Sequence, residues 1–244
     1  MTRRTGLLSL LLSVALAGPV VAAPILPGQQ DTFQSGNENW FFGGGPLGIP
    51  PTGADVEPTG GPGGAGDAFL HLTSTGTGGA PGSRLSVSNA QQWAGDYRAG
   101  GIDAISMWVN NFGTTDLSLR LAFEVLGMFG PTDIAFSADP VVVLAQSGWN
   151  QIVFPISDSD LMNFAAIPGS TIQGAMTNTN LIRIYHSPAD NSPNPFFPIV
   201  AVAADLGVDD ITAVAVPEPA TLLLLGAGLA GIAGTSRRRR RATN

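Results

Sequence analysis

Five side chains on predicted β-strands have the chemistry to bind a sugar. A pyranose ring packs its flat face against an aromatic ring, and its hydroxyl groups need polar partners with several bonding positions. Trp108, Arg120 and Glu124 each lie opposite the core-facing residues of their strands. Arg183 and Tyr185 share that property on a further strand. We therefore predict that these five residues form one glycan-binding face.

A structural role is the alternative for the same residues. Trp108 and Tyr185 would then cover a sheet edge beneath a loop, and Arg120 and Glu124 would only pair with each other. The remaining tryptophans are expected to be core residues or loop anchors, namely Trp40, Trp93 and Trp149.

Catalytic motifs are missing from the sequence. G-x-S-x-G and H-E-x-x-H do not occur, and the chain has no cysteine. His71 and His186 are isolated, and such histidines are more often structural than catalytic. We expect no enzymatic activity. A secreted glycan hydrolase stays open as the least favoured function, because the many acids offer carboxylate pairs.

The strands that carry these residues show a period of two. One face of such a half-buried strand is formed by Leu117, Leu119, Leu121, Phe123 and Val125, with Arg120 on the other face. Similar short segments, separated by glycine, proline or asparagine, are predicted at 68–73, 105–109, 139–144, 152–156, 181–185 and 208–214.

Seven or more short strands with turn-rich connections predict an all-β fold, a jelly-roll β-sandwich over residues 24–213. A short helix over 161–166 is expected after Ser157, where Ser157, Asp158 or Ser159 would cap it. The glycine- and proline-rich residues 43–66 are expected to form a loop that crosses an edge of the sandwich.

Residues 1–23 have the pattern of a signal peptide. Arg3 and Arg4 precede an apolar run from Leu7 to Ala17, and small residues follow at 21–23. We expect signal peptidase to remove this segment. The alternative is a retained N-terminal anchor.

Residues 214–244 have the pattern of a membrane-sorting tail. A Pro-Glu-Pro segment precedes a predicted single transmembrane helix at 220–235, and an arginine cluster follows; these residues are Pro217, Glu218, Pro219, Arg237, Arg238, Arg239, Arg240 and Arg241. The positive-inside rule places the arginines in the cytoplasm and the main domain outside the inner membrane.

This order of three parts resembles the PEP-CTERM sorting signal. The resemblance implies processing by an exosortase near Pro217-Glu218-Pro219, after transient anchoring in the inner membrane. The protein would then be released or attached at the cell surface. An ordinary tail anchor with a proline-rich stalk is the alternative.

The charge of the middle region limits the classes of molecule that it can bind. Between residues 24 and 213 stand four arginines, no lysine and 17 acids, a net charge of −13. Nucleic acid binding needs a basic surface and is excluded on this ground. Such acidity suits divalent cations or simply solubility.

The middle region resembles laminin B-type and carbohydrate-binding jelly rolls. The similar segments are Asp31-Thr32-Phe33 with Trp40, GGPGGAGDAFLHL, Trp93 with Gly95-Asp96-Tyr97, Gly148-Trp149, and Gly207 to Ile211. In such folds the first and last strands meet, often around one ion. The resemblance therefore implies a structural calcium, with the candidate ligands Asp31, Asp67, Asp209 and Asp210. Ordinary turn and bulge aspartates are the alternative.

Together these observations predict an exported, non-enzymatic surface or extracellular matrix protein. Its sandwich is expected to contact exopolysaccharide. A purely structural envelope protein that binds no glycan is the second interpretation.

Overall fold

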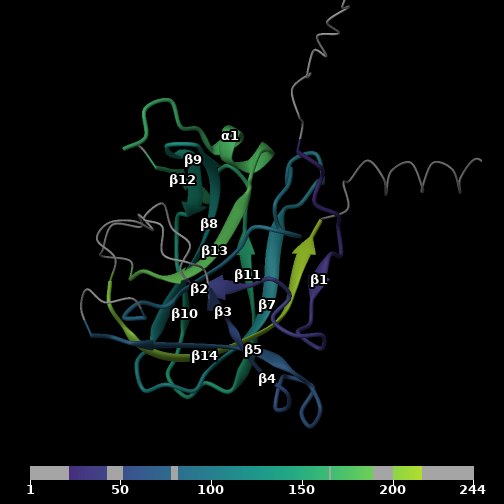
Figure 1. Cartoon of the computed structure of the whole chain (residues 1–244), viewed down its shortest axis with the longest axis vertical. Helices are drawn as coiled ribbons and strands as arrows, with labels where there is room; N and C mark the ends of the chain where they lie inside the picture. Colours follow the sequence, from purple (N-terminus) through teal and green to yellow (C-terminus); the bar gives the residue numbers. More distant parts are fainter. Residues whose placement is uncertain (1–21, 43–51, 78–81, 165, 189–199, 216–244) are drawn as a thin grey trace, which may run out of the picture.

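The computed structural model describes residues 22–42, 52–77, 82–164, 166–188 and 200–215. These residues form two antiparallel sheets packed face to face (Figure 1). The predicted signal peptide, apart from its last two residues, and nearly all of the sorting tail lie outside the described residues. No helix in the described part of the chain is long and apolar enough to span a bilayer.

The first sheet has six strands, with β14 near its centre. Its order is β11 (Trp149–Pro155), β7 (Ala104–Asn111), β14 (Ala203–Val214), β5 (Phe69–Thr75) and β4 (Asp55–Glu57), and β1 (Gln30–Asp31) also pairs with β14.

The second sheet has eight strands. Its order is β12 (Leu161–Asn163), β9 (Gly130–Ser137), β8 (Leu117–Gly127), β13 (Leu181–His186), β6 (Ser86–Asn89), β2 (Phe41–Phe42) and β3 (Thr52–Gly53), and β10 (Val141–Val143) also pairs with β8. The chain crosses repeatedly between the sheets, so the predicted jelly-roll sandwich is confirmed.

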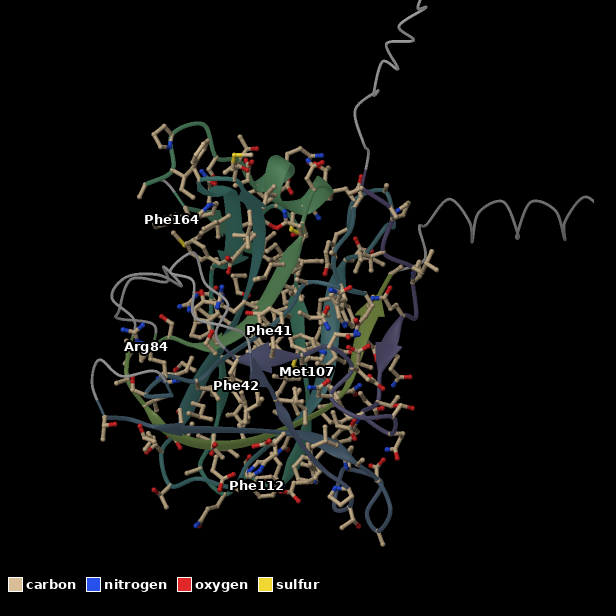
Figure 2. All side chains as sticks on the ribbon, viewed as in Figure 1. Phe41, Phe42, Arg84, Met107, Phe112 and Phe164 are labelled. Atoms are coloured by element: carbon tan, nitrogen blue, oxygen red, sulfur yellow. The ribbon has the colours of Figure 1, made fainter. Side chains whose placement is uncertain are left out.

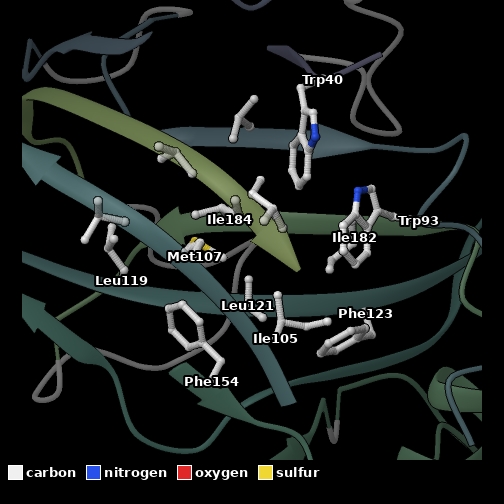
Figure 3. Packing of buried hydrophobic residues seen from close by; sticks show 14 of the residues in the cluster. Trp40, Trp93, Ile105, Met107, Leu119, Leu121, Phe123, Phe154, Ile182 and Ile184 are labelled. Carbon is white, nitrogen blue, oxygen red and sulfur yellow. The ribbon is translucent and has the colours of Figure 1, made fainter. Parts of the chain in front are cut away.

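The core lies between the two sheets, where alternate residues of each strand point inward (Figure 3). Ile105 and Met107 of β7 face Leu119 and Leu121 of β8, and all four are fully buried. The period of two in the sequence thus identifies the inward residues correctly.

β8 differs from the half-buried strand that was expected. Its second face is also covered, because Ala122 packs with Ile134, Phe136 and Tyr185 in a smaller apolar cluster. Phe164, which lies beyond β12, packs against the same cluster.

The helix predicted after Ser157 is wrong. Residues 157–160 form a turn, and the following residues form β12, which pairs with β9 through Leu161 and Ser137. The helix of the described chain is α1 (Ile172–Thr177), and Thr171 caps it by accepting a hydrogen bond from the N–H of Gly174 at 2.8 Å. Edge pairing with β9 outweighs the local capping signal.

The loop predicted at 43–66 is also partly wrong, because β3 and β4 lie within that range. The glycine-rich part after β4 is a loop as expected. It reaches the outer face of the six-stranded sheet, where the indole N–H of Trp149 donates to the carbonyl of Gly60 at 2.8 Å.

Candidate functional site

The outer face of the six-stranded sheet carries a group of aromatic rings. We call Phe69, His71, Phe112 and Trp149 the aromatic cluster. Phe69 and Trp149 meet edge to face with ring centres 5.2 Å apart, and Phe69 and Phe112 lie 5.8 Å apart. Such edge-to-face contacts are favourable arrangements for aromatic rings and fix their orientation.

The cluster depends on a glycine beneath it. Gly207 of β14 pairs with His71 and with Asn110. A Cβ atom at this position would lie 2.8 Å from Trp149 and 3.0 Å from Phe112. Only the absence of a side chain lets the rings close over the sheet.

Phe112 is the most exposed of the four rings in the cluster. It is 39% exposed, whereas Phe69 is buried. Figure 2 shows Phe112 at the lower end of the sandwich. The N–H groups of Phe112 and Gly113 both donate to the carbonyl of Asp205, at 2.9 and 3.2 Å, so the turn after β7 is fixed to β14.

Carboxylates flank the rings. Nε2 of His71 lies 2.7 Å from Oδ1 of Asp205, and its Nδ1 lies 3.5 Å from Oε1 of Glu57. About half of each acidic side chain is exposed, 47% for Asp205 and 50% for Glu57. Their free oxygens can accept hydrogen bonds from hydroxyl groups of a ligand.

Trp108 lies on this same sheet face, on the next outward position of β7. It pairs with Gln151 of β11 on one side and with Asp209 of β14 on the other. Its side chain is partly exposed. Trp108 therefore adds a second aromatic surface beside the cluster.

The five residues predicted as one glycan-binding face do not share a face. Trp108 belongs to the six-stranded sheet, and the other four belong to β8 and β13 of the eight-stranded sheet. Strand parity tells which side of a strand a residue occupies, but not which sheet the strand joins.

Three of the other four residues are buried, and Arg183 is nearly so. Glu124 is fully buried, and Arg183 binds it through Nε at 2.6 Å and Nη2 at 3.3 Å. Arg120 donates to the carbonyls of Ser137 and Ala138, both at 2.6 Å. The pairing of Arg120 with Glu124 that the structural alternative expected is therefore wrong, because Glu124 pairs with Arg183.

Tyr185 lies in the same covered region. It is 4% exposed, and burial raises the pKa of its hydroxyl well above the ordinary range, although Arg120 opposes this. These polar groups stabilise the packing on the outer side of β8 and β13.

Two tryptophans have a structural role, as predicted. The indole N–H groups of Trp40 and Trp93 both donate to Oδ2 of Asp31, each at 2.7 Å, and the three residues are buried. Gln92 adds a third donor to the same oxygen at 2.9 Å. This carboxylate is therefore used by the fold itself.

The other three calcium candidates lie near the bulge of β14. The register shifts after Asp209, and Asp210 has a φ of 50°. Asp67 accepts hydrogen bonds from Gly63 and Gln34. Burial, with repulsion from Asp210 and Asp67, raises the pKa of Asp209 to about 7.

No three acidic or histidine side chains among the described residues are placed to hold a metal ion. Calcium thus stays a prediction from sequence.

The sequence reasoning missed Phe69, His71 and Phe112. Phe69 and His71 alternate with Leu70 and Leu72, which are fully buried. Their outward position could therefore have been derived from parity. Phe112 follows the last residue of β7 and has no periodic signal.

Solved structures of similar shape include two carbohydrate-binding modules. The family 11 module from Clostridium thermocellum, solved with a β-1,3-1,4-mixed-linked tetrasaccharide, is 17% identical with a TM-score of 0.49, and the alignment covers 79% of this chain and 98% of that chain. The second, CBM28, described as specific for non-crystalline cellulose, is 11% identical with a TM-score of 0.42 and coverages of 80% and 99%.

Sequence comparison gives one result at the C-terminus. None of the curated proteins matches the chain. Residues 215–240 match the family model of the PEP-CTERM protein-sorting motif. The Pro-Glu-Pro segment and the arginine cluster fall within or directly beside this range and outside the described residues. The chain therefore carries, at its C-terminus, a PEP-CTERM protein-sorting motif.

Proposed function

We propose that this protein is exported, processed by an exosortase, and binds polysaccharide through the outer face of its six-stranded sheet. The sorting motif at residues 215–240 supports the export. The aromatic cluster over Gly207 is the observation that carries the binding. The sandwich acts by binding and performs no catalysis.

The chemistry of the face suits a sugar chain. Phe112 and Trp108 present partly exposed rings to the apolar faces of pyranoses. Asp205 and Glu57 accept hydrogen bonds from hydroxyl groups, and Gln151 can both donate and accept. Rings and bonding groups alternate along neighbouring strands, which fits an extended ligand.

The charge of the face selects neutral glycans. None of the six strands in this sheet contains an arginine or a lysine. Because these strands carry no arginine or lysine, their carboxylates repel the uronates of acidic polysaccharides. We therefore expect a neutral glycan to bind and an alginate-type polymer to be rejected.

A titration with purified protein tests the binding. We expect a neutral soluble glucan or the neutral fraction of the host exopolysaccharide to bind, and Phe112→Ala or Trp108→Ala to weaken binding about tenfold by removing a stacking surface. Val142→Ala is the matched control, because Val142 is 57% exposed on the eight-stranded sheet. Unchanged binding in both aromatic variants would contradict the proposed site.

Sorting is tested on the protein recovered from culture. Signal peptidase and an exosortase act on the two ends, so mass spectrometry should find a new N-terminus near residue 23 and a C-terminus near Pro217-Glu218-Pro219. The mature protein should lie at the cell surface or in the extracellular matrix. A chain intact through Asn244 would contradict this part of the proposal.

A further inference from the structure

The hairpin between β8 and β9 ends in two exposed apolar side chains. Met128 is 90% exposed and Phe129 is 99% exposed. We call Gly127–Gly130 the hairpin tip. No charged residue occurs between Glu124 and Asp133, and Glu124 is buried in its ion pair. Exposed apolar groups of this kind are typical of sites that bind another protein or a membrane.

The hairpin tip is held in place by the fold. Asn180 binds Leu126 twice: its Oδ1 accepts from the N–H of Leu126 at 2.8 Å, and its Nδ2 donates to the carbonyl at 3.0 Å. Thr132 donates across the hairpin to the carbonyl of Val125 at 3.3 Å. The two apolar side chains are therefore presented from a fixed backbone.

The described chain begins close to this hairpin. Pro24 forms a β-bridge with Asp96, and Gly95 forms one with Thr179. Thr179 directly precedes Asn180, the residue that binds Leu126. A short chain of contacts thus joins the start of the described chain to the hairpin.

The described chain also ends at this side of the sandwich. The N–H of Asp103 donates to the carbonyl of Val214 at 2.9 Å, and the N–H of Tyr97 donates to Met176 of α1 at 3.0 Å. In Figure 1, α1 and the start of the described chain both lie at the top of the view. The described chain therefore begins and ends at this end of the sandwich; in the sequence, the apolar residues 7–17 precede it and 220–235 follow it.

We propose that, before exosortase processing, the hairpin tip inserts into the outer surface of the bilayer while the apolar segment at 220–235 holds the chain in the membrane. This inference rests on the proposed export and sorting. Two apolar side chains give weak binding by themselves, but a tether greatly raises their effective concentration at the lipid surface. The inserted tip fixes the orientation of the sandwich on the membrane.

The lipid surface is recognised by apolar contact and not by charge. The domain has a net charge of −13, and no basic residue lies within the stretch from Glu124 to Asp133. Zwitterionic headgroups are therefore the suitable surface, and anionic lipid should not improve insertion.

The absence of cysteine makes a direct test simple. A Met128→Cys variant of the full chain, labelled with an environment-sensitive dye, is reconstituted into phosphatidylcholine vesicles. We expect a blue shift and at least fivefold stronger quenching by doxyl lipid than for a dye at Leu144→Cys. Leu144 is 59% exposed and follows β10, whose Val143 pairs with Leu117 at the opposite end of β8.

Vesicle flotation separates the insertion of the hairpin tip from the proposed sorting of the chain. If the protein floats with the vesicles and the dye at position 128 stays in water, the insertion is wrong and the sorting proposal stands. If the chain does not float, the tether is absent and the insertion is wrong, whereas the termini of the protein recovered from culture decide the sorting proposal. A blue shift that occurs without lipid and grows with protein concentration would show that the tip contacts a second copy of the chain. This result would overturn the proposed insertion into the membrane.

A second variant checks the contribution of the ring. Phe129→Ser should lower the quenching of the dye at position 128 several-fold and leave the melting temperature unchanged, because the side chain is 99% exposed. Unchanged quenching would overturn the proposal.

Discussion

At the residue scale, Gly207 determines how the aromatic cluster packs. A methyl group at this position would meet Trp149 at 2.8 Å, Phe112 at 3.0 Å and Phe69 at 3.1 Å. We expect Gly207→Ala to displace the rings and to lower the free energy of unfolding by about 1–3 kcal/mol, as overpacking does. Urea unfolding and glycan titration measure the two effects.

Val153→Ala is a useful control for that change. Val153 lies on the same sheet face and is 51% exposed, so little packing is lost. If Gly207→Ala changes neither stability nor glycan affinity, the ring packing does not position the binding surface.

His186 gives the protein a defined response to acid. Its Nδ1 accepts a hydrogen bond from the N–H of Ser118 at 3.0 Å, and burial lowers its pKa below the ordinary 6.5. The unfolded chain therefore takes up the proton more readily as the pH falls through 6.5, and stability decreases. We expect His186→Asn, which keeps an acceptor, to remove this part of the pH dependence.

Denaturant unfolding between pH 5 and pH 8 measures the His186 contribution. Comparing the variant with the wild type at each pH cancels the effect of the carboxylates, which are the same in both. An identical decrease in both proteins would show that His186 does not contribute.

At the element scale, the sequence predicts the strands well and their partners poorly. The segments around Leu70, Met107, Leu121 and Ile184 all form the expected strands, and most of the expected inward residues are buried. Their alternation follows from local geometry alone. Sheet membership depends on pairing between distant residues, for example Leu206 with Asn111, and no local pattern reports it.

The same limit explains the glycan-binding prediction. Trp108 and Arg120 are both outward residues on neighbouring strands in the sequence, but the chain changes sheets between them. The bulge at Asp209 could be predicted, because the inward positions shift between Val208 and Ile211, and the structure confirms it.

The ion pair between Glu124 and Arg183 joins two strands of the eight-stranded sheet. Because Glu124 is fully buried, Glu124→Leu leaves an arginine in an apolar region without this partner. We expect a loss of about 3–5 kcal/mol in the free energy of unfolding. The double variant with Arg183→Leu should recover part of it. Urea unfolding measures both, and equal losses in the two variants would contradict this interpretation.

At the scale of the whole molecule, the calcium expected from sequence has a simple test. Burial raises the pKa of Asp209 to about 7, and repulsion from Asp210 and Asp67 adds to this effect. We expect millimolar calcium to relieve the repulsion and raise the melting temperature more than magnesium does. Asp209→Asn should remove the difference, and equal melting temperatures in calcium and EDTA would contradict the prediction.

The two proposed surfaces lie at opposite ends of the sandwich. The hairpin tip follows the end of β8 that lies near α1, whereas Phe112 follows the other end of β7 (Figure 2). A chain held at the membrane by the hairpin end would present Phe112 away from the lipid. This arrangement keeps the aromatic cluster open to a polymer outside the cell.

The position of β14 has a consequence for secretion. This strand is the last of the sandwich, yet it pairs with β7, β5 and β1 inside the six-stranded sheet. Translocation delivers the chain from its N-terminus, so the sheet lacks its central member until residue 214 has crossed the membrane. The sandwich therefore cannot complete its fold until almost the whole chain has been translocated. Folding is completed only when the sorting motif reaches the bilayer.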